Sequence, residues 1–192
     1  MLDLTESFKT FPVLETERLH LREIVPADAE ALFKVFSDPQ VMAGHGTPVH
    51  QSVADTRRLI DWYAHAFPEK RALRWAVTRH GDDTALGTCG YHEITAYHHR
   101  AEIGYELASA EWRQGIMSEA VRAVVLFGLT QMGLHRVEAI VDPSNPASAN
   151  LLRKVGFTEE ATLRERFFDN GRFVNDWFFA ILATEVDRLR RE

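Results

Sequence analysis

The stretch that decides the fold runs from Ala101 to Met132 and reads AEIGYELASAEWRQGIMSEAVRAVVLFGLTQM. It begins with a strict alternation, in which Ile103, Tyr105 and Leu107 share one face and acidic residues or glycine share the other. A period of two predicts a β-strand. A short polar turn follows, and then a long run of helical composition ends before Gly133, which suits the left-handed position after a helix. We therefore expect a strand, a turn and a helix in direct succession.

The turn of this unit spans Arg113 to Ser118 and contains Gly115. The first amides of a helix have no internal partner, and the helix dipole places partial positive charge there, so such a turn can hold a phosphate group. Glycine lets an anion approach the backbone closely. The turn lacks the Lys-Ser or Lys-Thr pair of a P-loop and the three-glycine pattern of a dinucleotide fold. From these residues alone, an anion site and a plain connection both stay open.

The composition is that of a soluble globular protein. The chain has 192 residues, of which 45% are hydrophobic and 26% charged, and its net charge is −6. This balance disfavours a nucleic-acid partner and favours a cationic substrate. Cys89 is the one cysteine, so no internal disulfide can form, and a buried thiol in a reducing compartment is expected. The start of the chain has no apolar signal core and no apolar run reaches membrane-spanning length, so we expect a cytoplasmic protein with no membrane partner.

The rest of the chain supplies the other elements of a single α/β domain over residues 1–192. Residues 1–15 have no clear period and are expected to form a loosely held arm. Periodicity predicts strands at 18–24, 73–80, 85–95, 100–107 and 136–142, helices at 28–36 and 51–67, and a loop at 37–49. The three central strands form an antiparallel meander, whereas the helical crossover places 136–142 parallel to 100–107. A short helix from Pro146 to Gly156 then leads to a hairpin that turns at Asp169-Asn170-Gly171.

These elements, in this order, resemble the GNAT superfamily of N-acetyltransferases, in the branch of the ribosomal-protein acetyltransferases RimJ and RimL. The resemblance covers most of the chain and rests on Thr16–Arg22, Ala101–Tyr105, Trp112–Ala120, Asn145–Ser148 with Gly156–Phe157, and Asp169–Ile181. It implies the GNAT fold, an α/β fold with a mixed central sheet of about seven strands, flanked by helices and splayed between the fourth and fifth strands. One departure is Met117, where the family's pyrophosphate loop usually has Gly or Ala. The larger side chain is expected to strain the anion site without closing it.

The resemblance implies acetyl-CoA as the cosubstrate and assigns binding roles. The pyrophosphate would lie on the backbone amides of Gln114, Gly115, Ile116, Met117 and Ser118, with Arg113 adding positive charge. The pantetheine arm would pair, like an added strand, with backbone groups near Glu106 and Leu107. Asn145 would hydrogen-bond the arm, and Arg153 or Lys154 would lie near the adenosine end. For the charged residues, a solvated helix face is an equally good interpretation.

Acetyl transfer needs a neutral amine, whereas an alkylammonium with a pKa of ~10 is almost fully protonated at neutral pH. Glu102 matches the strand-four glutamate that takes this proton in related acetyltransferases, and Glu106, on the same strand face, is the alternative base. Ser148 matches the helix-start residue proposed as general acid in RimL-like enzymes. Each has a plainer interpretation: the carboxylates attract a cationic substrate or face solvent, and the hydroxyl satisfies a nearby backbone group.

The resemblance favours a protein N-terminal α-amine, ribosomal among others, as the acceptor. The alternatives are a small amine, such as a polyamine, an amino acid or an aminoglycoside, and a non-catalytic acyl-CoA-binding module. The resemblance also allows a homodimer. A metal site at His92, His98 and His99 is disfavoured, because adjacent histidines point to opposite sides and no cysteine or carboxylate completes a ligand set.

Overall fold

The computed structural model describes residues 1–43, 47–169 and 171–190. These residues form one mixed sheet of eight strands in the order β1-β2-β3-β4-β5-β6-β8-β7. The strands are β1 (Leu14–Glu15), β2 (Leu19–Glu23), β3 (Leu73–Arg79), β4 (Asp82–Thr95), β5 (Arg100–Leu107), β6 (Arg136–Val141), β7 (Thr158–Asp169) and β8 (Arg172–Leu182). The α/β class and the mixed sheet are confirmed. The strand count exceeds the expected one because β1, a two-residue strand in the first fifteen residues, pairs with β2.

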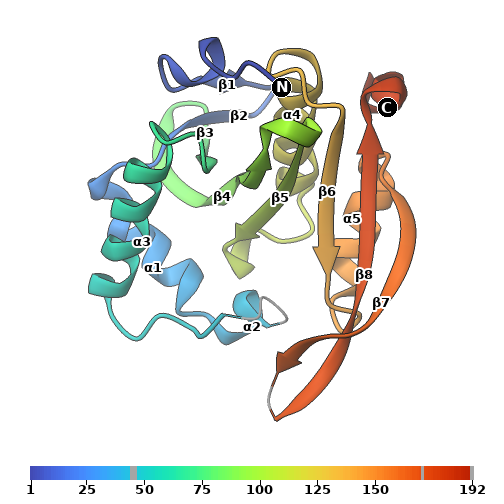
Figure 1. Cartoon of the computed structure of the whole chain (residues 1–192). Helices are drawn as coiled ribbons and strands as arrows, with labels where there is room; N and C mark the ends of the chain where they lie inside the picture. Colours follow the sequence, from blue (N-terminus) through green and yellow to red (C-terminus); the bar gives the residue numbers. More distant parts are fainter. Residues whose placement is uncertain (44–46, 170, 191–192) are drawn as a thin grey trace.

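The sheet is split at its centre by the pair β5 and β6. Within the described sheet this pair is parallel and every other neighbouring pair is antiparallel. The parallel register runs only from Arg100↔Arg136 to Glu102↔Glu138, although β5 continues to Leu107. Beyond Glu102 the two strands diverge, as Figure 1 shows. The splay that the resemblance implied is therefore present, between the strands that follow and precede the long crossover helix.

Helices cover both faces of the sheet. One group contains α1 (Ala29–Phe36), α2 (Pro39–Met42) and α3 (Val53–Ala66), and the other contains α4 (Ile116–Thr130) and α5 (Pro146–Val155) (Figure 1). Successive residues of β3 serve different faces: Trp75 and Val77 belong to the core cluster of α4 and α5, whereas Ala76 belongs to the cluster of α1 and α3. The alternation along a strand thus produces two hydrophobic layers, one on each side of the sheet.

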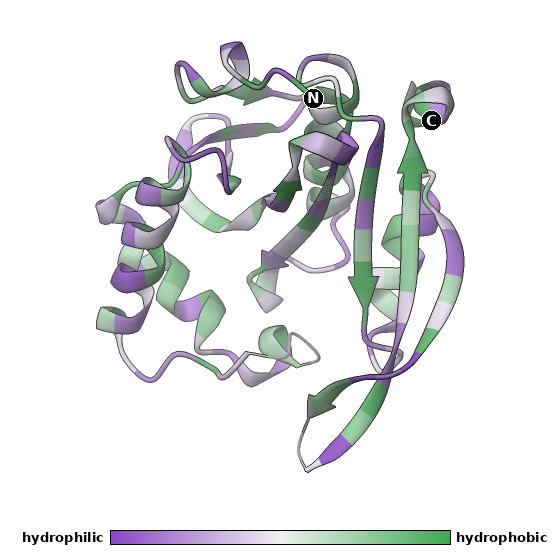
Figure 2. Ribbon diagram, viewed as in Figure 1, coloured by the Kyte–Doolittle hydropathy of each residue, from purple (hydrophilic) through white to green (hydrophobic). Residues whose placement is uncertain are grey.

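Hydropathy follows these layers. In Figure 2, β8 is hydrophobic over most of its length, whereas α3 mixes hydrophilic and hydrophobic residues. The burial agrees with this difference, because α3 buries Thr56, Ile60 and Ala66 and leaves most of its other residues partly or fully exposed. α4 buries residues around much of its circumference, as expected for a crossover helix between the sheet and α5.

The N-terminal arm is not loosely held, contrary to the expectation. Leu4 and Phe8 are buried in the larger core cluster. The indole N–H of Trp75 donates a 2.6 Å hydrogen bond to the carbonyl of Pro12, and the ring of Phe11 packs edge-on against Trp75. The arm lacks a period because its regular elements are only two or three residues long, and isolated aromatic and aliphatic side chains make its contacts with the core.

The expected loop at 37–49 contains the short helix α2. Asp38 caps this helix, because its Oδ1 accepts a 2.8 Å hydrogen bond from the backbone N–H of Gln40, and Pro39 occupies the first helical position. A helix of one turn is too short to produce a hydrophobic period, so the pattern did not predict it. Residues 44–46 of this segment and Asn170 of the hairpin turn lie outside the described residues.

Candidate active site

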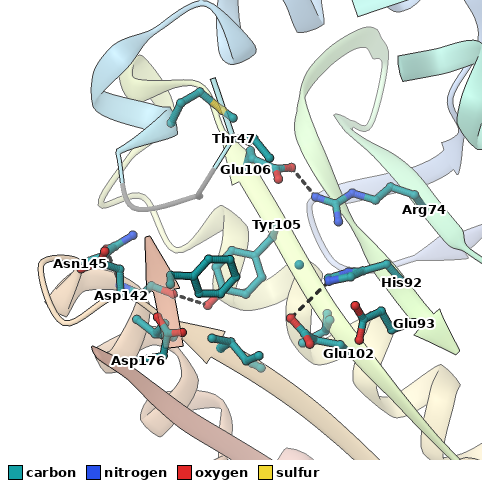
Figure 3. A pocket seen from close by; sticks show the side chains of 18 of the residues that line it. Thr47, Arg74, His92, Glu93, Glu102, Tyr105, Glu106, Asp142, Asn145 and Asp176 are labelled. Atoms are coloured by element: carbon teal, nitrogen blue, oxygen red, sulfur yellow. Dashed lines mark hydrogen bonds and ion pairs between the residues drawn. The ribbon is translucent and has the colours of Figure 1, made fainter. Parts of the chain in front are cut away.

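The divergence of β5 and β6 lies beside a cavity of about 510 Å³, a size typical of small-molecule sites. Its walls come from β4, β5 and β6, the start of α5, the β7–β8 hairpin and residues of the α1–α3 side. Figure 3 shows carboxylates from several of these elements gathered around it. The lining acids are Glu93, Glu102, Glu106, Asp142 and Asp176, and the lining guanidinium groups are those of Arg74 and Arg166. The excess of carboxylates favours a cationic ligand.

Glu102, the predicted base, lies in this cavity beside a histidine. The two residues are register partners across β4 and β5, and Nε2 of His92 is 3.2 Å from Oε1 of Glu102. The side chain of Glu102 is 16% exposed and that of His92 is 36% exposed, so both can be reached from the cavity. A carboxylate and an imidazole in contact can take up a proton from an incoming ammonium group. The sequence had drawn attention to His92 only as a metal ligand.

Asp142 and Asp176 add negative charge next to Glu102. Asp176 lies on β8, is 3% exposed and accepts a 3.3 Å ion pair from Arg166. Burial raises the pKa of Asp176, Arg166 opposes that shift, and the charges of Asp142 and Glu102 raise the pKa further. Asp142 and Glu102 therefore repel the charge of Asp176 at this cavity, and a bound cation would offset that repulsion.

Glu106, the alternative base, is engaged in structural contacts. It pairs with the guanidinium of Arg74 and accepts a 2.7 Å hydrogen bond from the hydroxyl of Thr88. Arg74 is 5% exposed and also donates through Nε to Thr88 at 3.0 Å. This network ties β3, β4 and β5 together, and it leaves Glu102 as the better placed of the two predicted bases.

Ser148, the predicted acid, lies at the start of α5 and touches a tyrosine. Its Oγ is 2.8 Å from the hydroxyl of Tyr105 on β5, and both residues line the cavity. Its backbone N–H donates to Oδ1 of Asn145, the cap of the helix, at 3.1 Å. Burial raises the pKa of Tyr105, while the hydrogen bond to Ser148 lowers it less, so the phenol stays protonated at neutral pH. The alternation of β5 had assigned Tyr105 to the core face, and no sequence signal paired it with Ser148.

The turn predicted to bind phosphate leads directly into α4 and has an irregular backbone. Gly115 caps α4 with φ 78° and Arg113 has φ 62°, so both residues are left-handed. The side chains of Ile116 and Met117 are buried in the core. The larger side chain at position 117 therefore packs into the core, while its amide stays in the first turn of α4.

Two of the predicted cofactor contacts are already engaged within the protein. The carbonyl of Leu107 accepts a 2.8 Å hydrogen bond from the indole N–H of Trp112. The guanidinium of Arg153 pairs with Glu159 at 2.5 Å and lies 5.3 Å from the ring centroid of Phe179. Arg153 is not among the residues that line the cavity.

Neither a metal nor a membrane segment is suggested by the part of the chain that the structure describes. Within residues 1–43, 47–169 and 171–190, no three His, Cys, Asp or Glu side chains gather closely enough to hold a metal ion. Among the same residues, no helix has the length and apolar character needed to cross a bilayer.

The GNAT acetyltransferase domain family matches residues 18–158 of this chain. A relative from Bacillus subtilis, named "Uncharacterized N-acetyltransferase YoaA", is 41% identical over 161 residues, which is 84% of this chain and 91% of the relative. Two further relatives differ in the acceptors that their names give. "Putative ribosomal N-acetyltransferase YdaF" of B. subtilis is 26% identical, with 88% of this chain and 93% of the relative covered. "Spermidine N(1)-acetyltransferase" of Escherichia coli is 25% identical, with 81% of each covered.

Solved structures share the fold. A GNAT-family acetyltransferase from Bacillus anthracis superposes with a TM-score of 0.82 at 26% identity and covers 91% of this chain and 100% of that chain. A spermidine N-acetyltransferase from Vibrio cholerae, solved with CoA and spermine, has a TM-score of 0.79 at 22% identity, with 89% and 99% covered. The mixed sheet and its flanking helices are therefore those of the GNAT fold. The chain belongs to the GNAT acetyltransferase family and is an N-acetyltransferase.

Proposed function

We propose that the protein transfers the acetyl group of acetyl-CoA directly to the α-amine of a polypeptide N-terminus. The observation that carries the choice of an amine is the group of carboxylates, Glu102, Asp142 and Asp176, around the cavity that Ser148 also lines. An amine arrives mostly as a cation, so this charge attracts it, and a carboxylate at the cavity wall can then remove its proton.

The start of α4 and the part of β5 beyond Glu102 support acetyl-CoA as the cosubstrate. The first amides of α4 follow the left-handed Gly115 and have no helical partner, so they can accept the pyrophosphate. Beyond Glu102, β5 has no partner strand on its β6 side within the described residues, which leaves room for the amide-bearing arm to run along it. Asn145 keeps its amide group at the cavity wall, although its oxygen caps α5.

The reaction then needs one proton acceptor and one donor to the leaving group. Glu102, with His92 in contact, takes the proton from the ammonium group, and the free amine attacks the thioester carbonyl carbon. A C–N bond forms, and the nitrogen of the tetrahedral intermediate loses its second proton to water. The intermediate then collapses, and the C–S bond breaks to release CoA as a thiolate. The Ser148 hydroxyl stabilises the developing charge on sulfur, and the Tyr105 phenol supplies a hydrogen bond behind it.

A polypeptide acceptor is favoured by aromatic residues at the end of the β7–β8 hairpin. Phe168 and Phe173 are 64% and 63% exposed and pack edge-on with centroids 5.1 Å apart. Phe167, beside them, is 42% exposed and lines the cavity. An exposed apolar surface next to a cavity fits a chain that enters by its first residue and continues across the rim.

A small polycationic amine is the second candidate, because the lining carboxylates outnumber the guanidinium groups five to two. Both are tested by incubating the protein and acetyl-CoA with a mixed panel of peptides and small amines, followed by mass spectrometry. We expect a single acetyl group on peptide α-amines, located by fragmentation. Turnover of polyamines with no peptide product would replace the first candidate with the second, and no product with any amine would overturn the activity itself.

A further inference from the structure

The turn in front of α4 is held in an unusual backbone shape by two arginines that are distant from it in sequence. Gln114 lies between two left-handed residues, Arg113 with φ 62° and Gly115 with φ 78°. A non-glycine residue in this region costs conformational energy and persists where surrounding contacts fix it. The contacts of Gln114 therefore identify what holds the turn.

Arg18, which precedes β2, makes the contact to the backbone of the turn. Its Nη1 donates a 2.9 Å hydrogen bond to the carbonyl of Gln114. On the other side, Arg79 at the end of β3 donates through Nη2 to Oε1 of Gln114 at 3.0 Å and to Glu111 at 2.8 Å. The turn is thus fixed at its main chain by one arginine and at its side chain by another, both distant in sequence.

Glu119 holds Arg18 in place from the first turn of α4. Its carboxylate accepts from the backbone N–H of Arg18 at 2.9 Å and from Nε at 2.7 Å, and it lies 2.6 Å from Nη2. Thr16 adds a 2.6 Å hydrogen bond to the same carboxylate. Burial opposes ionisation of Glu119, but the hydrogen bonds from Thr16 and Arg18 outweigh it and lower the pKa. Glu119 is therefore charged at neutral pH.

The negative charge of Glu119 lies close to the proposed phosphate site and would repel a phosphate there. A carboxylate in the first turn of α4 is one helical turn from the amides that are proposed to hold the pyrophosphate, and it repels a second anion unless it is neutralised. Arg18 neutralises it with a fork of two nitrogens and uses its third nitrogen to hold the carbonyl of Gln114. One planar guanidinium can make these three contacts together, whereas a lysine ammonium cannot reproduce the fork.

We infer that Arg18 is a positioning residue for acetyl-CoA: it shapes the turn that receives the pyrophosphate and screens the carboxylate of Glu119 from it. The inference rests on the proposed use of acetyl-CoA. It concerns the pyrophosphate alone, so a substrate without that group should not depend on Arg18. S-acetylpantetheine is such a substrate, because it keeps the thioester and both amides of the arm.

The test measures Arg18→Ala with both acetyl donors. We expect the Kd for acetyl-CoA, measured by calorimetry, to rise by about 10- to 100-fold, the range of a lost charge-assisted contact. We expect kcat/KM with S-acetylpantetheine to stay within about threefold of the parent, because the chemical step is untouched. Arg188→Ala is the matched control. The side chain of Arg188 is 50% exposed, that of Arg18 is 49% exposed, and Arg188 also forms an ion pair with a glutamate, Glu185.

A second variant separates positioning from simple loss of structure. If Arg18 screens Glu119, then Arg18→Ala with Glu119→Gln should bind acetyl-CoA several-fold more tightly than Arg18→Ala alone. Arg18→Lys serves if the alanine variant does not fold, and it should lose affinity for acetyl-CoA while keeping S-acetylpantetheine turnover. Equal losses with both donors, or no rescue by Glu119→Gln, would overturn the inference. A parent protein that binds no acetyl-CoA would instead overturn the proposed function.

Discussion

The hydroxyl of Tyr105 lies 2.8 Å from the hydroxyl of Ser148 and joins β5 to the start of α5 across the splay. The backbone of Ser148 is fixed as well, because its N–H donates a hydrogen bond to the capping side chain of Asn145. Two hydroxyl groups in contact can orient one another, and the raised pKa of the partly buried phenol keeps its proton available for donation. A serine hydroxyl is a weak acid by itself, so the phenol behind it matters to the proposed role.

The first prediction follows from this contact. Ser148→Ala should lower turnover by about 10- to 10³-fold, up to the loss of one oxyanion donor, and change acetyl-CoA affinity by less than about 1 kcal/mol. Tyr105→Phe should lower turnover less, by about 3- to 30-fold, because it removes only the hydrogen bond behind Ser148. The double variant, measured by steady-state kinetics, should be no slower than Ser148→Ala alone. Additive losses would mean that the two hydroxyls act separately.

The second prediction concerns Glu102 as the proton acceptor. Glu102→Gln keeps the shape and removes the basicity, so the rate at neutral pH should fall by about 10²-fold. The rate should recover in part at high pH, where the amine loses its proton unaided, and a pH-rate profile measures this. Glu30→Gln, on the exposed face of α1, makes the same change in net charge and serves as the control. An unchanged profile would assign the proton transfer to His92 or to water.

The third prediction concerns the buried pair of Glu106 and Arg74. Glu106→Gln leaves the guanidinium of Arg74, whose side chain is 4% exposed, without its carboxylate. Removing one partner of a buried ion pair costs about 3 kcal/mol or more, and this should appear in urea unfolding. Adding Arg74→Met should recover part of the loss, because a neutral pair leaves no uncompensated charge. A stable Glu106→Gln protein with greatly reduced turnover would instead indicate that Glu106 is the base.

The sequence predicted the long elements and the turn before α4 well, because each has a periodic signal or a glycine at a required position. Gly133, which the pattern placed in a left-handed position after a helix, has φ 75° beyond the end of α4. The sequence could not predict contacts between distant segments. Arg18 and Glu119 are 101 residues apart and Tyr105 and Ser148 are 43 apart, and only the fold brings each pair together. Periodicity assigns a side chain to a face, but at the splay a residue on the core face can also reach the cavity, as Tyr105 does.

The last prediction concerns Asp176, whose raised pKa relates stability to function. An acid whose pKa is higher in the folded state than in the unfolded state binds more protons when folded. The stability that this proton contributes is fully present below the unfolded pKa of about 3.9 and is lost as pH rises through the folded value. Asp176→Asn removes this loss, so the variant should match the parent near pH 3.5 and become the more stable protein toward pH 7.

The same variant removes charge that attracts the acceptor, so the KM for a cationic amine should rise by about 3- to 10-fold with little change in kcat. Urea unfolding across that pH range and kinetics at two ionic strengths measure both effects, with Asp61→Asn, an exposed position on α3, as the control for net charge. A variant that is less stable at pH 7 would show that the ion pair with Arg166 outweighs the burial of Asp176. A KM that does not change would place the acceptor away from this carboxylate.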